Sequence, residues 1–386
     1  MTEPRTSLRE LALLFLRLGA TAFGGPAAHI AMMRDEVVVR RGWLSDERFL
    51  DLLGATNLIP GPNSTEMAIH IGWQRRRAAG LLVAGLAFIV PAMLITGVCA
   101  WAYVSFGTRP EASWLLYGVK PVIIAVVVQA IWSLAPKAAK TRWLRVLGLL
   151  VLALSAYGVD ELLLLFGAGT LSLTVAPTLR RDLPASPPPT RSAQQTIALL
   201  PIAASSTAAL ITLPSLFWLF FKTGSVLFGS GYVLIAFLRG DLVQRLHWLT
   251  EAQLIDAVAI GQLTPGPVFT TATFIGYLLA GPNGALVATL GIFLPAFIFV
   301  ALSGPLVPRL RASAAAGSFL DGVNVASLAL MVVVTVQLGH AAVIDAPTAC
   351  LALASTVLLV RFQLGSTWLI ALGAATGWAL HTTGLR

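Results

Sequence analysis

The sequence predicts an all-α polytopic membrane protein with two inverted-topology repeats that contain broken helices. Hydrophobic residues make up 57% of the 386 residues and charged residues only 11%, whereas charged residues approach about a quarter of a soluble protein. Most apolar runs are close to the ~20 residues that a helix needs to cross a bilayer. They lack the period-2 alternation of barrel strands, which favours helices. In such a chain, the net charge of +9 indicates membrane orientation, and no nucleic acid partner is expected.

Internal repetition is the second observation behind this fold class. Residues 15–62 align without a gap on residues 220–267, with 16 of 48 positions identical. The identical positions include two motifs that recur in each copy, Phe23-Gly24 with Phe228-Gly229 and Pro60-Gly61-Pro62 with Pro265-Gly266-Pro267. Duplicated segments interrupted by Gly and Pro indicate where a transporter binds its substrate.

The apolar runs predict about thirteen spans. They lie near residues 9–31, 49–71, 79–105, 114–135, 143–157, 159–177, 196–213, 215–237, 252–279, 284–305, 317–339, 342–360 and 366–383. Each repeat takes six, and the single span between them starts the second repeat from the opposite side. The domains expected are residues 1–178 as the first repeat, 179–195 as a Pro/Ser/Arg linker, 196–213 as the extra span and 214–386 as the second repeat.

The positive-inside rule predicts a cytoplasmic N-terminus, because most of the 26 Lys and Arg residues then face the cytoplasm. The C-terminus is then periplasmic. Six basic residues are expected on the outer side, and four of them fall in one loop, residues 34–48: Arg34, Arg40, Arg41 and Arg48. We interpret this loop as a short interfacial element beside the site.

Each Pro-Gly-Pro run must break its helix, because proline removes a backbone donor and clashes with the preceding turn. Non-helical backbone at membrane depth is tolerated only where it is buried in protein or lines a water-filled cavity. The half-helix that follows directs unpaired N–H groups and a positive dipole end at the break. We therefore predict two anion sites, formed by Asn57, Pro60, Gly61, Pro62, Asn63, Ser64 and Thr65 in the first copy and by Gln262, Pro265, Gly266 and Pro267 in the second.

The Phe-Gly motifs predict a second break in each repeat. Gly24 and Gly25 in the first copy, and Gly229 and Ser230 in the second, would present free amides to the first break. The alternative is that these small residues only allow close helix packing.

Three cations fall within predicted spans, where each costs about 2.5–3.5 kcal/mol or more unless it is paired. Arg17 and Lys222 occupy the same repeat position, so we predict that both bind the anion. The alternatives are snorkelling to the interface or pairing with a buried carboxylate. Lys120, matched by Asn324 in the second repeat, is expected to snorkel.

Acidic groups at depth are the candidates for proton coupling. They are Glu66, Asp51 and Asp256. Glu66 follows Asn63 by three residues, so a capping box is the competing interpretation. The chain contains no P-loop, no H-E-x-x-H helix and no interpretable Ser/His/Asp set. We therefore expect no enzyme activity, no cofactor and no metal.

Motifs over nearly the whole chain, at residues 23–26, 50–66, 261–267 and 273–277, are similar to those of the chromate ion transporter family in its long form. The resemblance implies a bacterial inner-membrane carrier that expels chromate, confers chromate resistance and draws on the proton-motive force. The second half departs from the family pattern, with Ser230 in place of Gly and Ala236 in place of Pro.

The expected mechanism is alternating access, with chromate bound near the midplane between the crossed half-helices. Sulfate has the same tetrahedral shape, so a carrier of sulfate or another oxyanion is an alternative. An anion channel that uses the same sites is another. The expected partners are chromate or sulfate, the lipid bilayer and a second copy of the chain in a homodimer.

Overall fold

The structure is a computed structural model that describes residues 6–23, 25–107, 110–179, 211–228, 233–362 and 364–382. These residues form helices and no strands, as the sequence predicts. Several predicted features lie outside them: Gly24, Gly229, Ser230, residues 180–195 of the linker and residues 196–210 of the extra span.

The two repeats contain matching helices in the same order along the chain. The first repeat contains α1 (Leu8–Thr21), α2 (Gly25–Arg34), the π-helix η1 (Asp35–Arg40), α3 (Asp46–Thr56), α4 (Asn63–Phe106), α5 (Pro110–Ala138), α6 (Arg142–Ala156) and α7 (Glu161–Leu179). The second contains α8 (Leu213–Val226), α9 (Leu234–Leu238), the π-helix η3 (Arg239–Arg245), α10 (Glu251–Leu263), the 3-10 helix η4 (Val268–Thr270), α11 (Thr271–Ala312), α12 (Ala314–Ala342), α13 (Ala346–Phe362) and α14 (Ser366–Thr382). Even the π-helices recur at matching positions.

α4 and α11 each reverse direction inside the helix. The turns lie at Arg76 and Arg77 and at Ala280 and Gly281, whose φ and ψ angles are not helical. The limbs of α11 lie side by side, because the Thr273 and Thr289 hydroxyl oxygens are hydrogen-bonded at 2.7 Å. The limbs of α4 meet at Gly72 and Gly80, where a Cβ on either residue would collide with the backbone of the other. A short returning limb therefore follows each Pro-Gly-Pro break.

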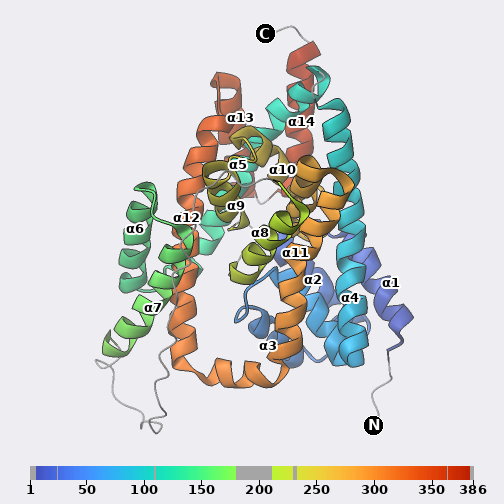
Figure 1. Cartoon of the computed structure of the whole chain (residues 1–386), viewed down its shortest axis with the longest axis vertical. Helices are drawn as coiled ribbons and strands as arrows, with labels where there is room; N and C mark the ends of the chain where they lie inside the picture. The colour runs from blue at the N-terminus through green and yellow to red at the C-terminus, as the bar shows by residue number, and fades with distance from the viewer. Residues whose placement is uncertain are drawn as a thin grey trace.

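The N-terminal segments up to the tip of the short α4 limb lie in the half of the molecule where the chain begins (Figure 1). Arg75, at the tip of the short α4 limb, donates hydrogen bonds to the Thr6 hydroxyl at 2.8 Å and to the Trp43 carbonyl at 2.9 Å. The start of α1 and the 34–48 loop therefore lie at the same end, and the prediction that this loop faces the opposite side is wrong. A 14-residue helix such as α1 rises only about 21 Å, too little for a hydrocarbon core of about 30 Å.

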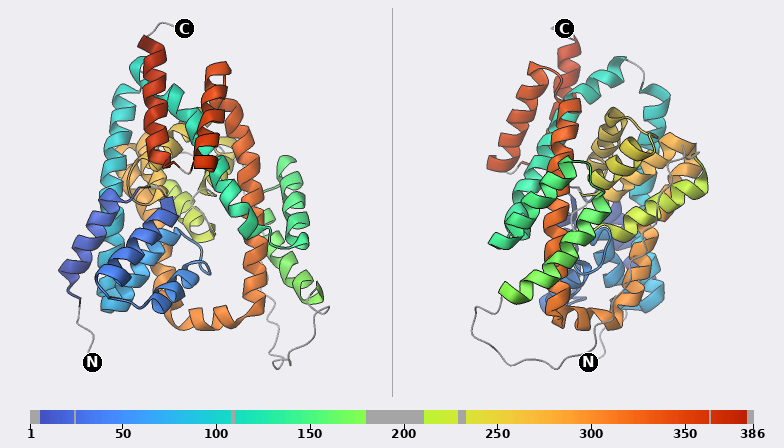
Figure 2. Two further views of the ribbon diagram at one scale, coloured as in Figure 1. Left: turned by 180° about the vertical axis from the view of Figure 1, so that it is seen from behind. Right: turned by 60° about the vertical axis from the view of Figure 1, so that its left-hand side comes forward.

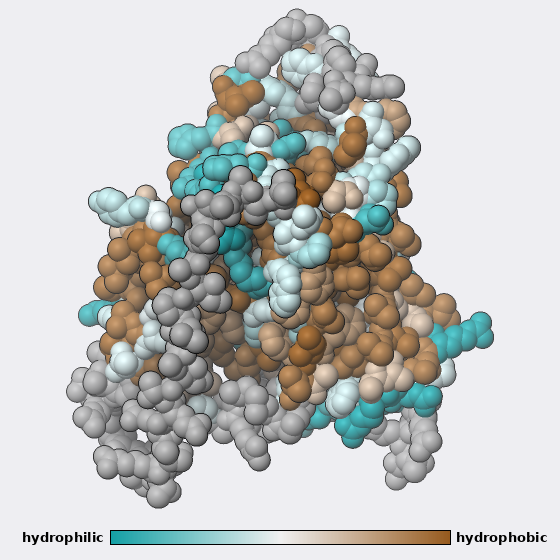
Figure 3. All heavy atoms as spheres, viewed as in Figure 1, coloured by the Kyte–Doolittle hydropathy of each residue, from teal (hydrophilic) through white to brown (hydrophobic). Residues whose placement is uncertain are grey.

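Four helices in the described part of the chain are long and apolar enough to cross a membrane. They are Asn63–Phe106, Trp114–Ala138, Val268–Ser303 and Ala315–Ala342, with shorter apolar helices at Glu161–Val175, Ala346–Phe362 and Ser366–Leu380. Apolar side chains cover much of the face seen in Figure 3. These features confirm an all-α membrane protein, whereas the count of about thirteen spans is not confirmed.

Matching helices of the two repeats end at opposite ends of the molecule. α4 ends and α5 begins near the end where α14 finishes, whereas the connection between α11 and α12 lies near the end where α1 starts (Figures 1 and 2). The repeats are also intertwined, because α5 packs against α13 and α14, and α12 packs against α6 and α7. Gly118 allows close backbone contact with Gly373, and its counterpart Gly322 allows the same contact with Ala168.

Candidate functional site

The Pro-Gly-Pro break of each repeat is hydrogen-bonded to the Phe-Gly segment of the other repeat. The Gly61 N–H donates to the Leu227 carbonyl at 2.7 Å, and the Gly266 N–H donates to the Ala22 carbonyl at 2.9 Å. Both glycines have a positive φ, +141° and +86°, which L side chains rarely adopt. The predicted helix breaks are therefore present, but the two glycine amides bond to protein carbonyls and are not available to an anion.

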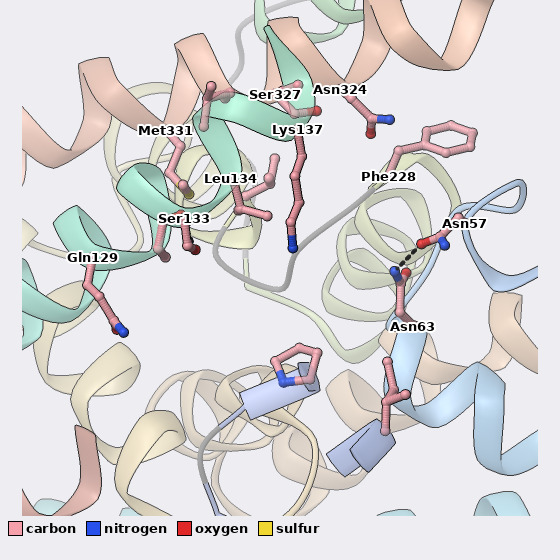
Figure 4. A pocket seen from close by; sticks show the side chains of 16 residues that line it. Asn57, Asn63, Gln129, Ser133, Leu134, Lys137, Phe228, Asn324, Ser327 and Met331 are labelled. Carbon is pink, nitrogen blue, oxygen red and sulfur yellow. Dashed lines mark hydrogen bonds between the residues drawn. The ribbon is translucent and has the colours of Figure 1, made fainter. Parts of the chain in front are cut away.

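A cavity of about 460 Å³ lies beside the first of these crossings. Both repeats form its wall, through α2, the first break, the start of α4 and the end of α5 on one side and through Phe228, Val233 and α12 on the other. Its polar lining consists of Asn57, Asn63, Gln129, Ser133, Lys137, Asn324 and Ser327 (Figure 4).

The electrostatics of the cavity suit an anion. The Lys137 side chain extends into it from α5 (Figure 4) and forms no ion pair with any residue that the structure describes. Asn63 donates its side-chain amide to the Asn57 side-chain oxygen at 3.0 Å, which fixes both amides at the wall. The described lining contains no carboxylate. A lysine surrounded by amide and hydroxyl groups can neutralise and hydrogen-bond an oxyanion.

The structure brings some of the predicted binding residues to this cavity. Asn57 and Asn63 line it directly. Pro60, Gly61 and Pro62 form the break between them. Two others are remote from the surface of the cavity, because Ser64 and Thr65 are buried within the first turn of α4. Gly25 begins α2 with a φ of +78°, next to Pro26 of the lining.

The break in the second repeat does not border the cavity. Gln262 is buried there. Pro265, Gly266 and Pro267 lead into η4, where the Thr270 hydroxyl donates to the Pro267 carbonyl at 2.8 Å. Of this set, none lines the 460 Å³ cavity.

The cations predicted to bind the anion are paired with buried carboxylates. Arg17 forms an ion pair with Glu36, and Lys222 forms one with Asp241 at 2.6 Å. Both acids are at the same repeat position, and their side chains are only 8% and 11% exposed. Neither cation lines the cavity. Pairing with an acid is the alternative that the sequence left open, and binding of the anion by these cations stays a prediction.

An additional arginine at a matching position joins each of these ion pairs. Arg40 lies 3.2 Å from Glu36 and Arg245 lies 2.8 Å from Asp241. Burial raises the pKa of Glu36, but hydrogen bonds and charge from Arg17 and its neighbours outweigh burial, so this pKa lies below its ordinary value. The two clusters therefore hold the ends of α1 and α8 against η1 and η3.

The three acidic candidates have different surroundings. Glu66 is fully buried against the α-carbon of Gly61, and neither of its carboxylate oxygens has a hydrogen-bond partner among the described residues. The N-terminus of α4 has no side-chain cap, so the capping box of Glu66 with Asn63 is absent. Asp51 is exposed, 3.9 Å from Arg48.

Asp256 is buried in a contact between the repeats. It lies 3.1 Å from the Lys120 ammonium and accepts a hydrogen bond of 2.8 Å from the Tyr103 hydroxyl. The expectation that Lys120 snorkels is therefore wrong. The helix α10 brings a carboxylate within reach, and pairing with it offsets the cost of the partly buried cation.

Lys137, Asn324 and Ser327 are lining residues that the sequence did not identify as a site. The counterpart of Lys137 in the second repeat is Ala341, so the repeat carried no signal for it. Asn324 did have a signal, because it matches Lys120, a cation within a span.

Comparison with known proteins identifies the family. The chromate transporter family matches residues 9–173 and again residues 214–378. The chromate transport protein of Cupriavidus metallidurans is 34% identical over 384 residues, which cover 97% of this chain and 93% of the relative. The probable chromate transport protein of Synechococcus elongatus is 31% identical over 373 residues, which cover 94% and 92%.

A third relative, the chromate transport protein of Pseudomonas aeruginosa, is 32% identical over 348 residues, which cover 87% of this chain and 82% of the relative. No solved structure matches the chain. The family consists of transporters, which confirms that the chain is not an enzyme. With matches in both repeats and over nearly its full length, the chain belongs to the chromate transporter family.

Proposed function

We propose that this protein exports chromate from the cytoplasm across the bacterial inner membrane by alternating access, and thereby confers chromate resistance. The observation that carries the proposal is the cavity between the repeats, in which Lys137, Asn57 and Asn63 face a common space with no carboxylate in its described lining. A tetrahedral dianion needs such donors and a cation. The names of the relatives supply the choice of chromate.

The inverted arrangement of the repeats is part of this proposal. Matching connections lie at opposite ends of the molecule (Figure 1), which supports two copies of opposite orientation with the extra span at 196–213 between them. The cavity lies beside the basic connection between α5 and α6, where Lys140 and Arg142 follow Lys137. The positive-inside rule then assigns this end, and the N-terminus, to the cytoplasm and the C-terminus to the periplasm.

Membrane potential alone can drive this export. One charge moved through ~100 mV is worth about 2.3 kcal/mol, so a dianion gains about 4.6 kcal/mol when it leaves a negative interior. This energy corresponds to about three decades of concentration.

Proton coupling is a further part of the proposal. Among Glu66, Asp51 and Asp256, Glu66 is the best candidate proton carrier, because its buried carboxylate has no described partner and lies against the break. A buried carboxylate without a partner is most stable when protonated.

The other predicted residues act at a distance in this proposal. The cluster around Glu36 contains three guanidinium groups, those of Arg17, Arg40 and Arg41, against the carboxylates of Glu36 and Asp35. The cluster around Asp241 contains Lys222 and Arg245. The cluster around Glu36 therefore carries excess positive charge, which attracts a dianion toward the repeats. In the cluster around Asp241, the nearby Glu161 carboxylate balances the second cation.

Uptake of labelled chromate into everted membrane vesicles tests the proposal, with the voltage and the pH gradient imposed separately. We expect saturable uptake that rises when the lumen is made positive. Lys137→Gln should raise the KM for chromate at least tenfold, while Lys140→Gln, which removes the same charge outside the cavity lining, should leave it unchanged.

The same assay separates the alternatives. Sulfate that competes at lower concentrations than chromate would assign the protein to sulfate. Conductive flux without saturation would identify a channel. An unchanged KM in Lys137→Gln would remove the cavity from the transport path.

A further inference from the structure

Lys137 and Asn324 lie at the same level of the cavity, on antiparallel parts of α5 and α12. One turn further along, the Lys140 ammonium lies 2.9 Å from the Asp321 carboxylate, which shows that the two helices are in this register. Both Lys137 and Asn324 line the cavity. This level of the cavity therefore combines one lysine with one amide.

The repeat assigns a counterpart to this pair. Gly118-Val119-Lys120 aligns with Gly322-Val323-Asn324, and both glycines make equivalent close helix contacts. The same offset aligns Lys137 with Ala341. The counterpart of Lys137 and Asn324 is therefore Ala341 and Lys120, so that each end of the α5 and α12 pair has one lysine, supplied by α5 in both cases.

The two ends differ in how tightly they are packed. At the cavity, α12 presents Ser327, Leu328 and Met331 to the open space. Their counterparts on α5 are Ile123, Ile124 and Val127. These residues pack with Ile255 and Val258 of α10 around a void of only about 10 Å³. One end of the pseudo-symmetric pair is open, and the matching end is closed.

At the closed end, Lys120 is engaged in an ion pair. Its ammonium lies 3.1 Å from Asp256, which also accepts the Tyr103 hydroxyl at 2.8 Å. The counterpart of Asp256 is Asp51, which is exposed on α3, the helix that leads to Asn57 of the cavity lining. The same repeat position is therefore buried in a contact between the repeats in one copy and exposed in the other copy.

We propose that Lys120 is the anion-binding lysine of a second cavity, which opens to the opposite side of the membrane, and that Asp256 and Tyr103 cover it in the present conformation. This inference rests on the proposed alternating access. In the second conformation, α10 is separated from α5, just as the first break is separated from α12 in the present structure. Asp256 is then no longer paired with Lys120. The freed ammonium then faces Gln262, the counterpart of Asn57, and takes an oxyanion such as chromate or sulfate.

Sidedness of transport tests this assignment. Lys120→Gln alone would leave Asp256 buried without its partner, so the variant to measure is Lys120→Gln/Asp256→Asn, with Lys140→Gln as the control for loss of a lysine. In right-side-out vesicles, the double variant should raise the KM for labelled chromate about tenfold. In everted vesicles its KM should stay within twofold of the parent, whereas Lys137→Gln should show the reverse pattern.

Lys120→Arg should keep the KM near that of the parent in both vesicle types, because it retains the cation. An unchanged KM of the double variant in right-side-out vesicles would overturn the proposal. An equal rise in both vesicle types would also overturn it, since the residue would then act on folding or on both states.

Thiol accessibility tests the same assignment without relying on transport. It therefore distinguishes failure of the second cavity from failure of the proposed transport function. Cys99 and Cys350 are the free cysteines of the described chain and are replaced by Ala. Lys137→Cys and Lys120→Cys are then labelled with a membrane-impermeant thiol reagent from one face at a time. We expect labelling from opposite faces, with faster labelling at position 120 when Asp256→Asn is added. Labelling of both positions from the same face would refute the second cavity even if chromate transport is normal.

Discussion

The amide of Gly61 donates a 2.7 Å hydrogen bond to the carbonyl of Leu227 in the other repeat, and Gly266 mirrors this bond to Ala22 at 2.9 Å. Each repeat therefore satisfies the broken backbone of the other. An unsatisfied backbone group costs several kcal/mol in a membrane, so the two breaks depend on each other. The first of these two crossings lies beside the cavity between the repeats.

Gly266→Ala should destabilise the protein more than Gly42→Ala. Both residues have positive φ, +86° and +56°, but a Cβ on Gly266 would lie 2.6 Å from the Ala92 Cβ and 2.8 Å from the Gly19 carbonyl oxygen, whereas nothing lies within 4 Å of one on Gly42. Backbone strain of about 1–3 kcal/mol is common to both variants. We expect a lower thermal midpoint for Gly266→Ala in detergent. Equal midpoints would show that the contact at the crossing is not tight.

Lys222→Gln should reduce stability as well as transport, because Arg245 is then the remaining ion-pair partner of Asp241 among the residues that the structure describes. A charged group without its partner costs about 1–3 kcal/mol. Lys222→Gln/Asp241→Asn removes both charges and should recover most of the lost thermal stability. Chromate uptake of the double variant then distinguishes the roles of Lys222. Recovery of uptake assigns it to structure, and continued loss of uptake at normal membrane abundance assigns it to the anion.

The stability that Glu36 provides should disappear in acid. Its pKa lies below the ordinary value, because the guanidinium groups of Arg17 and its neighbours outweigh the effect of burial. A lowered pKa stabilises the folded state at neutral pH, and this contribution is lost as pH falls below the ordinary carboxylate value of about 4.3. We expect the difference in thermal midpoint between the parent and Glu36→Gln to be largest at pH 7 and to shrink below about pH 4. A difference that is constant with pH would exclude the ion pair as its source.

Local sequence chemistry predicted the helical class and the position of the breaks. Proline and glycine act within one or two turns of themselves, so Pro60-Gly61-Pro62 alone sets the end of α3 and the start of α4. The repeat also located equivalent positions in both halves. These signals need no knowledge of distant contacts.

The direction of the segments after each break could not be predicted in this way. The limbs of α4 have the composition of two spans. The chain reverses between them at Arg76 and Arg77, and Gly72 and Gly80 allow the limbs to pack closely. The partners of Arg17 and Lys222 were also missed, although Glu36 and Asp241 share a repeat position. Two acids at matching positions were the available signal. Lys137 had none, because the second copy has Ala341.

Asn57→Asp should weaken anion binding without altering the shape of the cavity. The substitution replaces an amide by a carboxylate of the same size at the wall, where Asn63 already donates to the side-chain oxygen of residue 57. That hydrogen bond survives, but the new negative charge repels a dianion and competes with it for Lys137. At an effective dielectric constant of about 20, two unit charges 4 Å apart interact by about 4 kcal/mol, so even a partly screened charge should raise the KM for chromate more than tenfold. Asn283→Asp adds the same charge at the exposed turn of α11, outside the lining, and should leave the KM in everted vesicles unchanged. A similar KM for both variants would mean that the anion does not pass Asn57.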